Sequence, residues 1–147
     1  MFEGIEEYFG VPSNEVVGMP VTEYVPSVID KVCGDPPPKG VFYLLRVDGS
    51  LAGMGGLRFV RSGLAEIKRI YVRPKYRGMR LGESLLERVV SDATAFGYEK
   101  LCLDSGPFMT AAQRIYVTAG FRDCEAYDGT EVPVEFRPRW RFMERDL

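Results

Sequence analysis

The sequence predicts a mixed α/β fold of three layers, in which helices pack against a central sheet. Two observations carry this prediction. Three strand-like segments joined by tight turns follow one another between residues 41 and 72. Helical and strand-like segments then alternate, as they do in βαβ units. With 147 residues the chain can bury a substantial core, so we expect one domain over residues 1–147.

The first 40 residues are the least regular part of the chain. Residues 1–20 show no clear hydrophobic period, so they predict no particular element. Thr22–Cys33 predicts one or two short helices, with Pro26 as a break. Gly34–Gly40 carries three consecutive prolines and predicts a stiff loop, which is too short to link two domains.

Three predicted strands come next. Val41–Val47 predicts a strand, and Asp48-Gly49 is a hairpin signal that leads into its partner, Leu51–Val60. The partner contains three glycines, which indicate a bulge or a close approach of backbones: Gly53, Gly55 and Gly56. After a second turn, Leu64–Val72 predicts the third strand.

The segment after residue 80 has helical periodicity. Apolar residues recur there at every fourth position, namely Leu81, Leu85, Val89 and Ala93. Gly97 indicates the C-terminal cap of this helix. A short buried strand over Lys100–Leu103 and a second helix over Thr110–Ala119 are expected next, and Phe121 begins another strand.

Near the C-terminus, apolar and charged residues alternate. The apolar set is Val134, Phe136, Pro138, Trp140 and Phe142, and the charged set is Glu135, Arg137, Arg139 and Arg141. This period of two predicts a strand over residues 134–142 with one face in water. Pro138 predicts that the strand lies at an edge or contains a bulge.

A basic loop joins the third predicted strand to the helix. It reads Val72-Arg73-Pro74-Lys75-Tyr76-Arg77-Gly78-Met79-Arg80-Leu81-Gly82. Backbone N–H groups in the first turn of a helix lack helical partners, and the helix dipole adds partial positive charge. Such a junction attracts phosphate. The local charge agrees, because residues 58–88 hold nine Lys or Arg and three Asp or Glu. We therefore expect a ligand that carries phosphates to bind here.

The composition excludes several classes of protein. A net charge of −2 argues against general nucleic-acid binding, and no apolar run is long enough to span a membrane. Three cysteines without a CxxC pair or a signal peptide predict reduced thiols in the cytoplasm. Because the chain has no histidine, Ser-His and Cys-His catalysis and histidine–metal sites are excluded.

The order of these motifs resembles the GNAT superfamily of acyl-CoA-dependent N-acetyltransferases. The family's loop motif is Arg/Gln-x-x-Gly-x-Gly/Ala, which Arg77 opens and Gly82 closes, with Arg80 in place of the usual middle glycine. The segments AEIKRIYVRPKYRG and AAQRIYVTAGF extend the resemblance, which spans roughly residues 41–121. It implies a central mixed, mostly antiparallel sheet of six to seven strands with helices on both faces.

The resemblance also implies where acetyl-CoA, the co-substrate, would bind. The molecule would lie in a gap between the strand that ends near Val72 and the strand near Leu103, and no metal is implied. The residues implied to contact it are Ile70, Tyr71, Val72, Arg77, Gly78, Met79, Arg80, Leu81, Gly82 and Glu83. The amine would attack the thioester directly, without an acyl-enzyme. Such a reaction depends mainly on positioning.

Tyr116 matches the family's usual general acid, which protonates the departing CoA thiolate. A phenol with a pKa of about 10 and a thiol with a pKa of about 8.5 are close enough for useful proton transfer. The alternative is a core aromatic on a helix stripe with Ala112 and Ala119.

Glu66 precedes Arg77 by eleven residues, a spacing at which some family members hold a general base. It shares strand parity with Lys68, Ile70 and Val72. It could take a proton from the amine directly or through water, if it is buried enough to be an effective base. The alternative is a structural ion pair with a neighbouring Lys or Arg.

The leading functional hypothesis is a cytoplasmic N-acetyltransferase that acts on a small-molecule or peptide amine. The alternative is a GNAT-like module that binds acyl-CoA without turnover. Four aromatic residues are candidates for an acceptor pocket, although packing in the core or in a dimer is favoured for each: Phe108, Tyr127, Phe136 and Trp140. The sequence identifies neither the acceptor nor the acyl length, and it leaves a homodimer open. Nucleic acids and membranes are not expected partners.

Overall fold

The computed structural model describes residues 2–147. Its helices are α1 (Phe2–Phe9), α2 (Ser13–Val17), α3 (Val21–Cys33), α4 (Leu81–Ala95) and α5 (Thr110–Thr118). Its strands are β1 (Val41–Val47), β2 (Ser50–Arg61), β3 (Leu64–Val72), β4 (Lys100–Ser105), β5 (Arg122–Cys124) and β6 (Arg141–Asp146). Within this described part, no helix is long and apolar enough to cross a bilayer.

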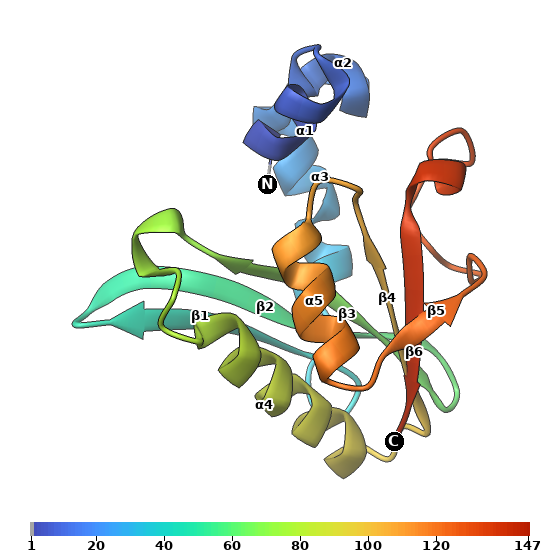
Figure 1. The fold of residues 1–147 in the computed structure, drawn as a ribbon. Helices are drawn as coiled ribbons and strands as arrows, with labels where there is room; N and C mark the ends of the chain where they lie inside the picture. The colour runs from blue at the N-terminus through green and yellow to red at the C-terminus, as the bar shows by residue number, and fades with distance from the viewer. Residues whose placement is uncertain (1) are drawn as a thin grey trace.

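The six strands form one mixed sheet in the order β1-β2-β3-β4-β6-β5. Only β3 and β4 run parallel, and the other neighbours are antiparallel. Helices α4 and α5 cover one face of the sheet, and α3 packs behind β1 and β2 on the other (Figure 1). The predicted three-layer α/β fold with a mostly antiparallel sheet is therefore confirmed.

The core lies between the sheet and the helices α4 and α5. The predicted apolar stripe of α4 is directed inward, and Leu85, Val89 and Ala93 are buried. These helix residues pack against alternate residues of the strands. Among those strand residues, Leu57 and Leu101 are almost fully buried. Because strand residues alternate between faces, the intervening positions of β3 and β4 face the opposite side, where polar residues gather.

A β-bulge divides β3 at Arg69, whose φ of 59° lies in the left-handed region. The register of β2 against β3 shifts between Met54 and Gly56 at this point. Space is short at Gly55, where a Cβ would lie 2.7 Å from Ile70 Cδ1, 2.9 Å from Leu85 Cδ2 and 3.1 Å from Ile70 Cα. The shared parity predicted for Glu66, Lys68, Ile70 and Val72 is wrong beyond the bulge, since Ile70 packs against the core.

Two local expectations are corrected at Pro26 and at the N-terminus. Helix α3 runs through Pro26 without a break. A proline in a helix removes one backbone hydrogen bond, and this exposed helix accommodates that loss. Helices α1 and α2 lie in the stretch for which the sequence predicted no element. At the hairpin, Asp48 and Gly49 both have positive φ, as the predicted tight turn requires.

The strand expected over residues 134–142 is wrong in its first part, because the observed strand begins at Arg141. A 3₁₀ helix over Arg137–Arg139 precedes it. Pro138 has no N–H for a strand ladder. The N–H of Arg139 instead donates to the carbonyl of Phe136 at 3.0 Å, which tightens the chain into a turn.

Candidate active site

The candidate site is a cleft that opens where β3 and β4 part. The two strands pair only between residues 64–66 and 100–102, and Figure 1 shows them diverging beyond this point. A cavity of about 640 Å³ lies between the unpaired part of β3, the start of α4, and α5. Every residue expected to contact acetyl-CoA lines this cavity except Met79.

One end of the cleft is formed by residues 77–83, and we call it the donor end. Gly78 has φ 82° and Arg80 has φ 57°, after which α4 begins at Leu81. A left-handed residue followed by helical ones turns successive N–H groups toward the same side. Among the described residues, no side chain caps this end of α4. Its N–H groups are thus suited to an anion.

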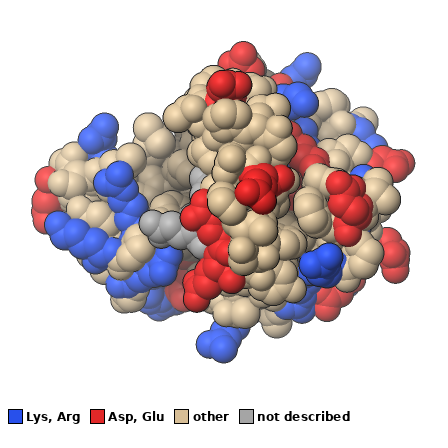
Figure 2. All heavy atoms as spheres, turned by 90° about the horizontal axis from the view of Figure 1, so that it is seen from above, with Lys and Arg blue, Asp and Glu red and all other residues tan. Residues whose placement is uncertain are grey.

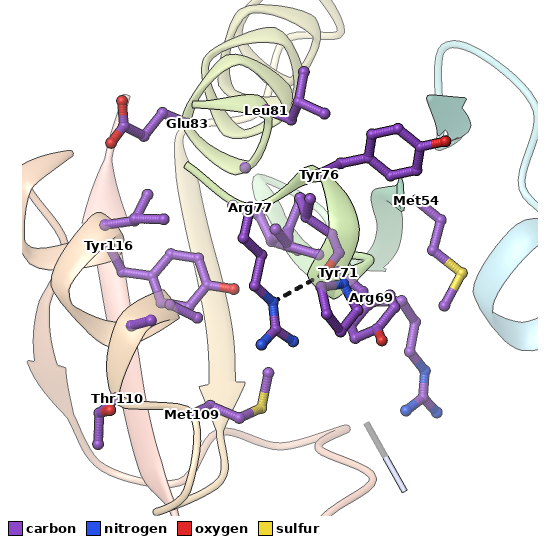
Figure 3. A pocket seen from close by; sticks show the side chains of 18 of the residues that line it. Met54, Arg69, Tyr71, Tyr76, Arg77, Leu81, Glu83, Met109, Thr110 and Tyr116 are labelled. Carbon is purple, nitrogen blue, oxygen red and sulfur yellow. Dashed lines mark hydrogen bonds between the residues drawn. The ribbon is translucent and has the colours of Figure 1, made fainter. Parts of the chain in front are cut away.

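The side chains of the donor end leave that backbone accessible. A Cβ on Gly82 would lie 3.5 Å from Ile115 Cδ1, so this position faces the space between β3 and α5. Arg80 is turned toward solvent, with its side chain 79% exposed and paired with Glu83. Arg77 Nε donates to the carbonyl of Val72 at 3.4 Å, and Figure 3 shows its guanidinium extending along the cleft.

Tyr116 lies on α5 at the middle of the cleft. The residue is only 4% exposed, yet its side chain lines the cavity and its hydroxyl points across the cleft toward Arg77 (Figure 3). Burial, with a smaller contribution from the charge of Asp104, raises the pKa of Tyr116 well above its ordinary value. The phenol therefore keeps its proton at neutral pH and can donate it. The ring also packs against Phe121, as expected of a core aromatic.

Glu66 is fully buried and does not line the cavity. Its Oε2 accepts a hydrogen bond from Arg58 Nε at 2.5 Å. Its Oε1 accepts hydrogen bonds from Lys68 Nζ at 3.2 Å and from the Tyr127 hydroxyl at 2.5 Å. Both carboxylate oxygens are therefore occupied. This is the ion-pair arrangement that the sequence left as the alternative, and the role of Glu66 as a base stays a prediction.

The cleft's other end, which we call the acceptor end, contains charged residues that the sequence did not single out. Lys68 Nζ lies 3.4 Å from Asp104 Oδ2 and 3.1 Å from Glu131 Oε2, in addition to its contact with Glu66. Of these residues, Lys68 and Asp104 line the cavity. We call Arg58, Glu66, Lys68, Asp104 and Glu131 the ion cluster. One sequence signal was available, because Asp104 directly follows the short buried strand predicted over Lys100–Leu103.

Burial and charge act in opposite directions within the ion cluster. Burial would lower the pKa of Lys68, but the carboxylates of Asp104, Glu66 and Glu131 outweigh it and hold the pKa above its ordinary value. Burial would likewise raise the pKa of Glu131, but the charge of Lys68 outweighs it and lowers the pKa. Lys68 is therefore a cation and Glu131 an anion at neutral pH.

Three of the four aromatic candidates pack against the N-terminal helix α1, and Tyr127 packs instead against Phe142, with ring centroids 5.8 Å apart. Phe9 lies with its ring centroid 5.4 Å from that of Phe136 and 6.3 Å from that of Trp140. Phe108 packs against Tyr8 and Trp140, with centroids 6.0 and 6.1 Å away, and it also lines the cavity. Packing thus explains these aromatics, as favoured from the sequence, and Phe108 alone among them also faces the cleft.

Charge is divided across the cleft. Figure 2 shows basic side chains gathered on the side of the molecule formed by β2, β3 and the loop before α4, with acidic side chains beside the hollow near the centre. Arg69, Arg77 and Arg80 belong to the basic wall of the cavity, and Glu7 on α1 belongs to its acidic side. A polyanion such as CoA would therefore be attracted along the basic wall.

Comparison with known sequences gives consistent matches. The model of the acetyltransferase (GNAT) family matches residues 7–121. An uncharacterized N-acetyltransferase of Schizosaccharomyces pombe is 32% identical over 66% of this chain and 61% of its own length. An IAA acetyltransferase of Azospirillum brasilense is 33% identical over 72% of this chain and 67% of its own length. About a third or more of each relative lies outside the match.

Comparison with solved structures shows the same fold. An acetyltransferase from Streptococcus agalactiae superimposes with a TM-score of 0.70 at 24% identity, covering 86% of this chain and 77% of the other. A GNAT family acetyltransferase from Elizabethkingia anophelis with acetyl-CoA bound has a TM-score of 0.64 at 23% identity, covering 82% of each chain. At these identities the likeness shows the fold alone.

Proposed function

Since the chain belongs to the acetyltransferase (GNAT) family, we propose that it transfers an acetyl group from acetyl-CoA to a primary amine. The amine attacks the thioester directly, within a ternary complex. One observation carries the proposal: a single cleft joins the uncapped N-terminus of α4 to the buried hydroxyl of Tyr116. The pyrophosphate and the thioester of acetyl-CoA lie at the two ends of its pantetheine arm, so one extended ligand can use both features.

Acetyl-CoA binds along the free part of β3 in this proposal. The N–H groups of residues 77–83 hold the pyrophosphate, because they are uncapped and face the cavity. The pantetheine arm pairs with the backbone of β3 near Ile70 and Val72, where β4 no longer pairs with it. Arg77 leaves the Val72 carbonyl when that pairing forms, since its contact there is long and exposed.

Tyr116 serves as the general acid. Its proton passes to the thiolate as the C–S bond breaks, and the raised pKa of its phenol keeps that proton available at neutral pH. For Glu66, the two alternatives are a general base and a structural ion pair behind the site. Its contacts support the second role, because both its oxygens are occupied and neither faces the cavity.

The acceptor is a small-molecule or peptide amine. Relatives of this fold are named for different acceptors, among them N-acetylaspartate synthetase of mouse and ribosomal-protein-S18-alanine N-acetyltransferase of Escherichia coli. We therefore choose test amines of several kinds: L-aspartate, a peptide that begins with alanine, 1,4-diaminobutane and 2-phenylethylamine.

The test is release of free thiol when the protein is mixed with acetyl-CoA and each amine, with mass spectrometry of the acetylated product. We expect amine-dependent thiol release that saturates in both substrates. Tight acetyl-CoA binding by calorimetry without thiol release from any amine contradicts this function. It would support the alternative, an acyl-CoA-binding module without turnover.

A further inference from the structure

The acceptor end of the cleft carries charges of both signs. Of the described residues, two cations line it from β3, Lys68 and Arg69. Two carboxylates line it from other elements, Asp104 on β4 and Glu7 on α1. The ion cluster itself has two cations and three carboxylates, and Arg69 beside it brings their formal sum to zero. Such surroundings complement a ligand that also carries both charges.

The β-bulge of β3 gives Arg69 its place in the cavity wall. In a regular strand, residue 69 would share the face of Ile67, which is buried in the core. The bulge adds one residue at this point, so Ile70 takes the core position and Arg69, half-buried, lines the cavity. Residues other than glycine seldom adopt a φ such as the 59° of Arg69, and such strained positions cluster at functional sites. The bulge therefore indicates a role for the Arg69 side chain.

Arg69 lies at the acceptor end rather than the donor end. Figure 3 shows its guanidinium at the end of the cleft away from Leu81, where Met109 also lies. The electrostatics agree with this placement. Burial raises the pKa of Glu131, the charge of Lys68 lowers it, and the nearby charge of Arg69 adds to the lowering. The Arg69 guanidinium is therefore within electrostatic reach of the ion cluster.

The two cations of the acceptor end differ in what they can still bind. The Lys68 ammonium has three N–H donors, and it contacts three carboxylates at 3.1 to 3.4 Å. It has no donor left for a substrate. The Arg69 guanidinium has five N–H donors in a planar fork. It can therefore bind a carboxylate through two parallel hydrogen bonds in addition to a contact with the protein.

We propose that the acceptor is an amino acid whose carboxylate is bound by Arg69, while its amine lies beside Tyr116. This inference rests on the proposed function and names the class of its acceptor. The acidic residues Asp104 and Glu7 attract the ammonium form, and Arg69 holds the other charged group. Two fixed points orient the amine toward the thioester, and direct transfer depends on such positioning. A diamine is disfavoured, because in the same orientation its second ammonium would meet Arg69.

The test uses pairs of amines that differ only by one carboxylate: L-phenylalanine and 2-phenylethylamine, L-alanine and ethylamine, and L-ornithine and 1,4-diaminobutane. The quantity measured is kcat/KM for each amine at saturating acetyl-CoA, from thiol release and mass spectrometry of the product. In the pair that reacts fastest, the wild type should prefer the amino acid by about tenfold or more, as expected for hydrogen bonds to a charged group. Equal values, or a preference for the member without the carboxylate, overturn the inference.

Arg69→Met tests the assignment of the carboxylate site, with Arg46→Met as the matched control. Arg46 is an exposed residue of β1 that donates to the carbonyl of Gly49 at 2.9 Å and does not line the cavity. Arg69→Met should lower kcat/KM for the amino acid by about tenfold to 100-fold and leave the value for its partner amine nearly unchanged. The preference is then lost. Arg46→Met should keep the wild-type preference.

An arginine with a merely structural role gives a different result. Both members of a pair then lose activity alike in Arg69→Met and the preference stays as in the wild type, which overturns the inference. Arg69→Gly suits the positive φ of this position and gives the same comparison if Arg69→Met fails to fold. Absence of wild-type thiol release with every amine contradicts the proposed function itself, whereas turnover without a carboxylate preference contradicts only this inference.

Discussion

The two ends of the cleft are built in different ways. The donor end consists of seven consecutive residues, 77–83, and offers mainly backbone N–H groups at the start of α4. The acceptor end gathers side chains from β2, β3, β4 and the segment after β5, and its geometry depends on ion pairs between them. The donor end thus depends on local chain geometry, and the acceptor end depends on tertiary packing.

This difference has a consequence for substitutions. At the donor end, we expect a change to matter when it alters charge or backbone conformation, because the proposed phosphate contacts are made by backbone N–H groups. At the acceptor end, removal of one partner leaves buried charges uncompensated, which affects both stability and chemistry. Tyr116 lies between the two ends and should show the largest effect of all.

Tyr116→Phe should lower kcat by about 10²- to 10⁴-fold, the usual range for general acid catalysis. Acetyl-CoA affinity and Tm should stay nearly normal, because phenylalanine fills almost the same volume and keeps the ring contact with Phe121. The check is kcat, calorimetric affinity and Tm on this one variant. Full turnover with a small loss of stability would support the core-aromatic alternative and remove Tyr116 from the mechanism.

Gly82→Asp should weaken acetyl-CoA binding by about tenfold or more, because it places a negative charge beside the phosphate. Gly82→Ala is the matched control. A Cβ at this position meets Ile115 Cδ1 at 3.5 Å and Val72 Cγ2 at 3.8 Å, which are ordinary contacts, so both variants should fold. Calorimetry with acetyl-CoA measures the difference, and equal affinities for the two variants would contradict the phosphate site.

Arg80→Gly should weaken CoA more than dephospho-CoA if the arginine reaches the 3′-phosphate. Glycine preserves the positive φ of this position and removes only the side chain. The effect should be about fivefold or less, because Arg80 is exposed and exposed ion pairs contribute about 1 kcal/mol at most. Equal losses for both ligands would mean that the side chain serves only Glu83 and solvent.

Glu131→Gln should reduce stability at neutral pH by about 1 kcal/mol, as expected for a partly buried ion pair. Lys68 holds the folded-state pKa of Glu131 below its ordinary value of 4.5. The stabilisation is therefore complete above that value and is lost as pH falls through the folded pKa. Tm measured against pH should show the gap between wild type and variant closing in acid. A constant gap would contradict the ion-pair account.

The sequence predicted most of what depends on neighbouring residues. The bounds of β3, the helix stripe of α4, the turn at Asp48-Gly49 and the loop before α4 all follow from local patterns. The donor end could therefore be predicted in detail, and nearly all its expected residues line the cleft.

The sequence could not predict features that arise when distant segments meet. The bulge at Arg69 lies opposite Gly55 of the neighbouring strand, and it reverses the faces expected for Ile70 and Val72. Lys68 forms these ion pairs only when Asp104 and Glu131 approach it, from 36 and 63 residues further along the chain. The alternation of apolar and charged residues near the C-terminus is also compatible with turns. The aromatic residues of these turns pack against α1.

Two-substrate initial-rate kinetics on Gly82→Asp and Asp104→Asn test the division of the cleft most directly. The account predicts that Gly82→Asp raises the KM for acetyl-CoA and leaves kcat and the amine KM nearly unchanged. Asp104→Asn removes a carboxylate that lines the cavity at the acceptor end, so it should change kcat or the amine KM and leave the KM for acetyl-CoA unchanged. If both variants instead raise the KM for acetyl-CoA alike, the cleft does not have separate donor and acceptor ends, and the account is wrong.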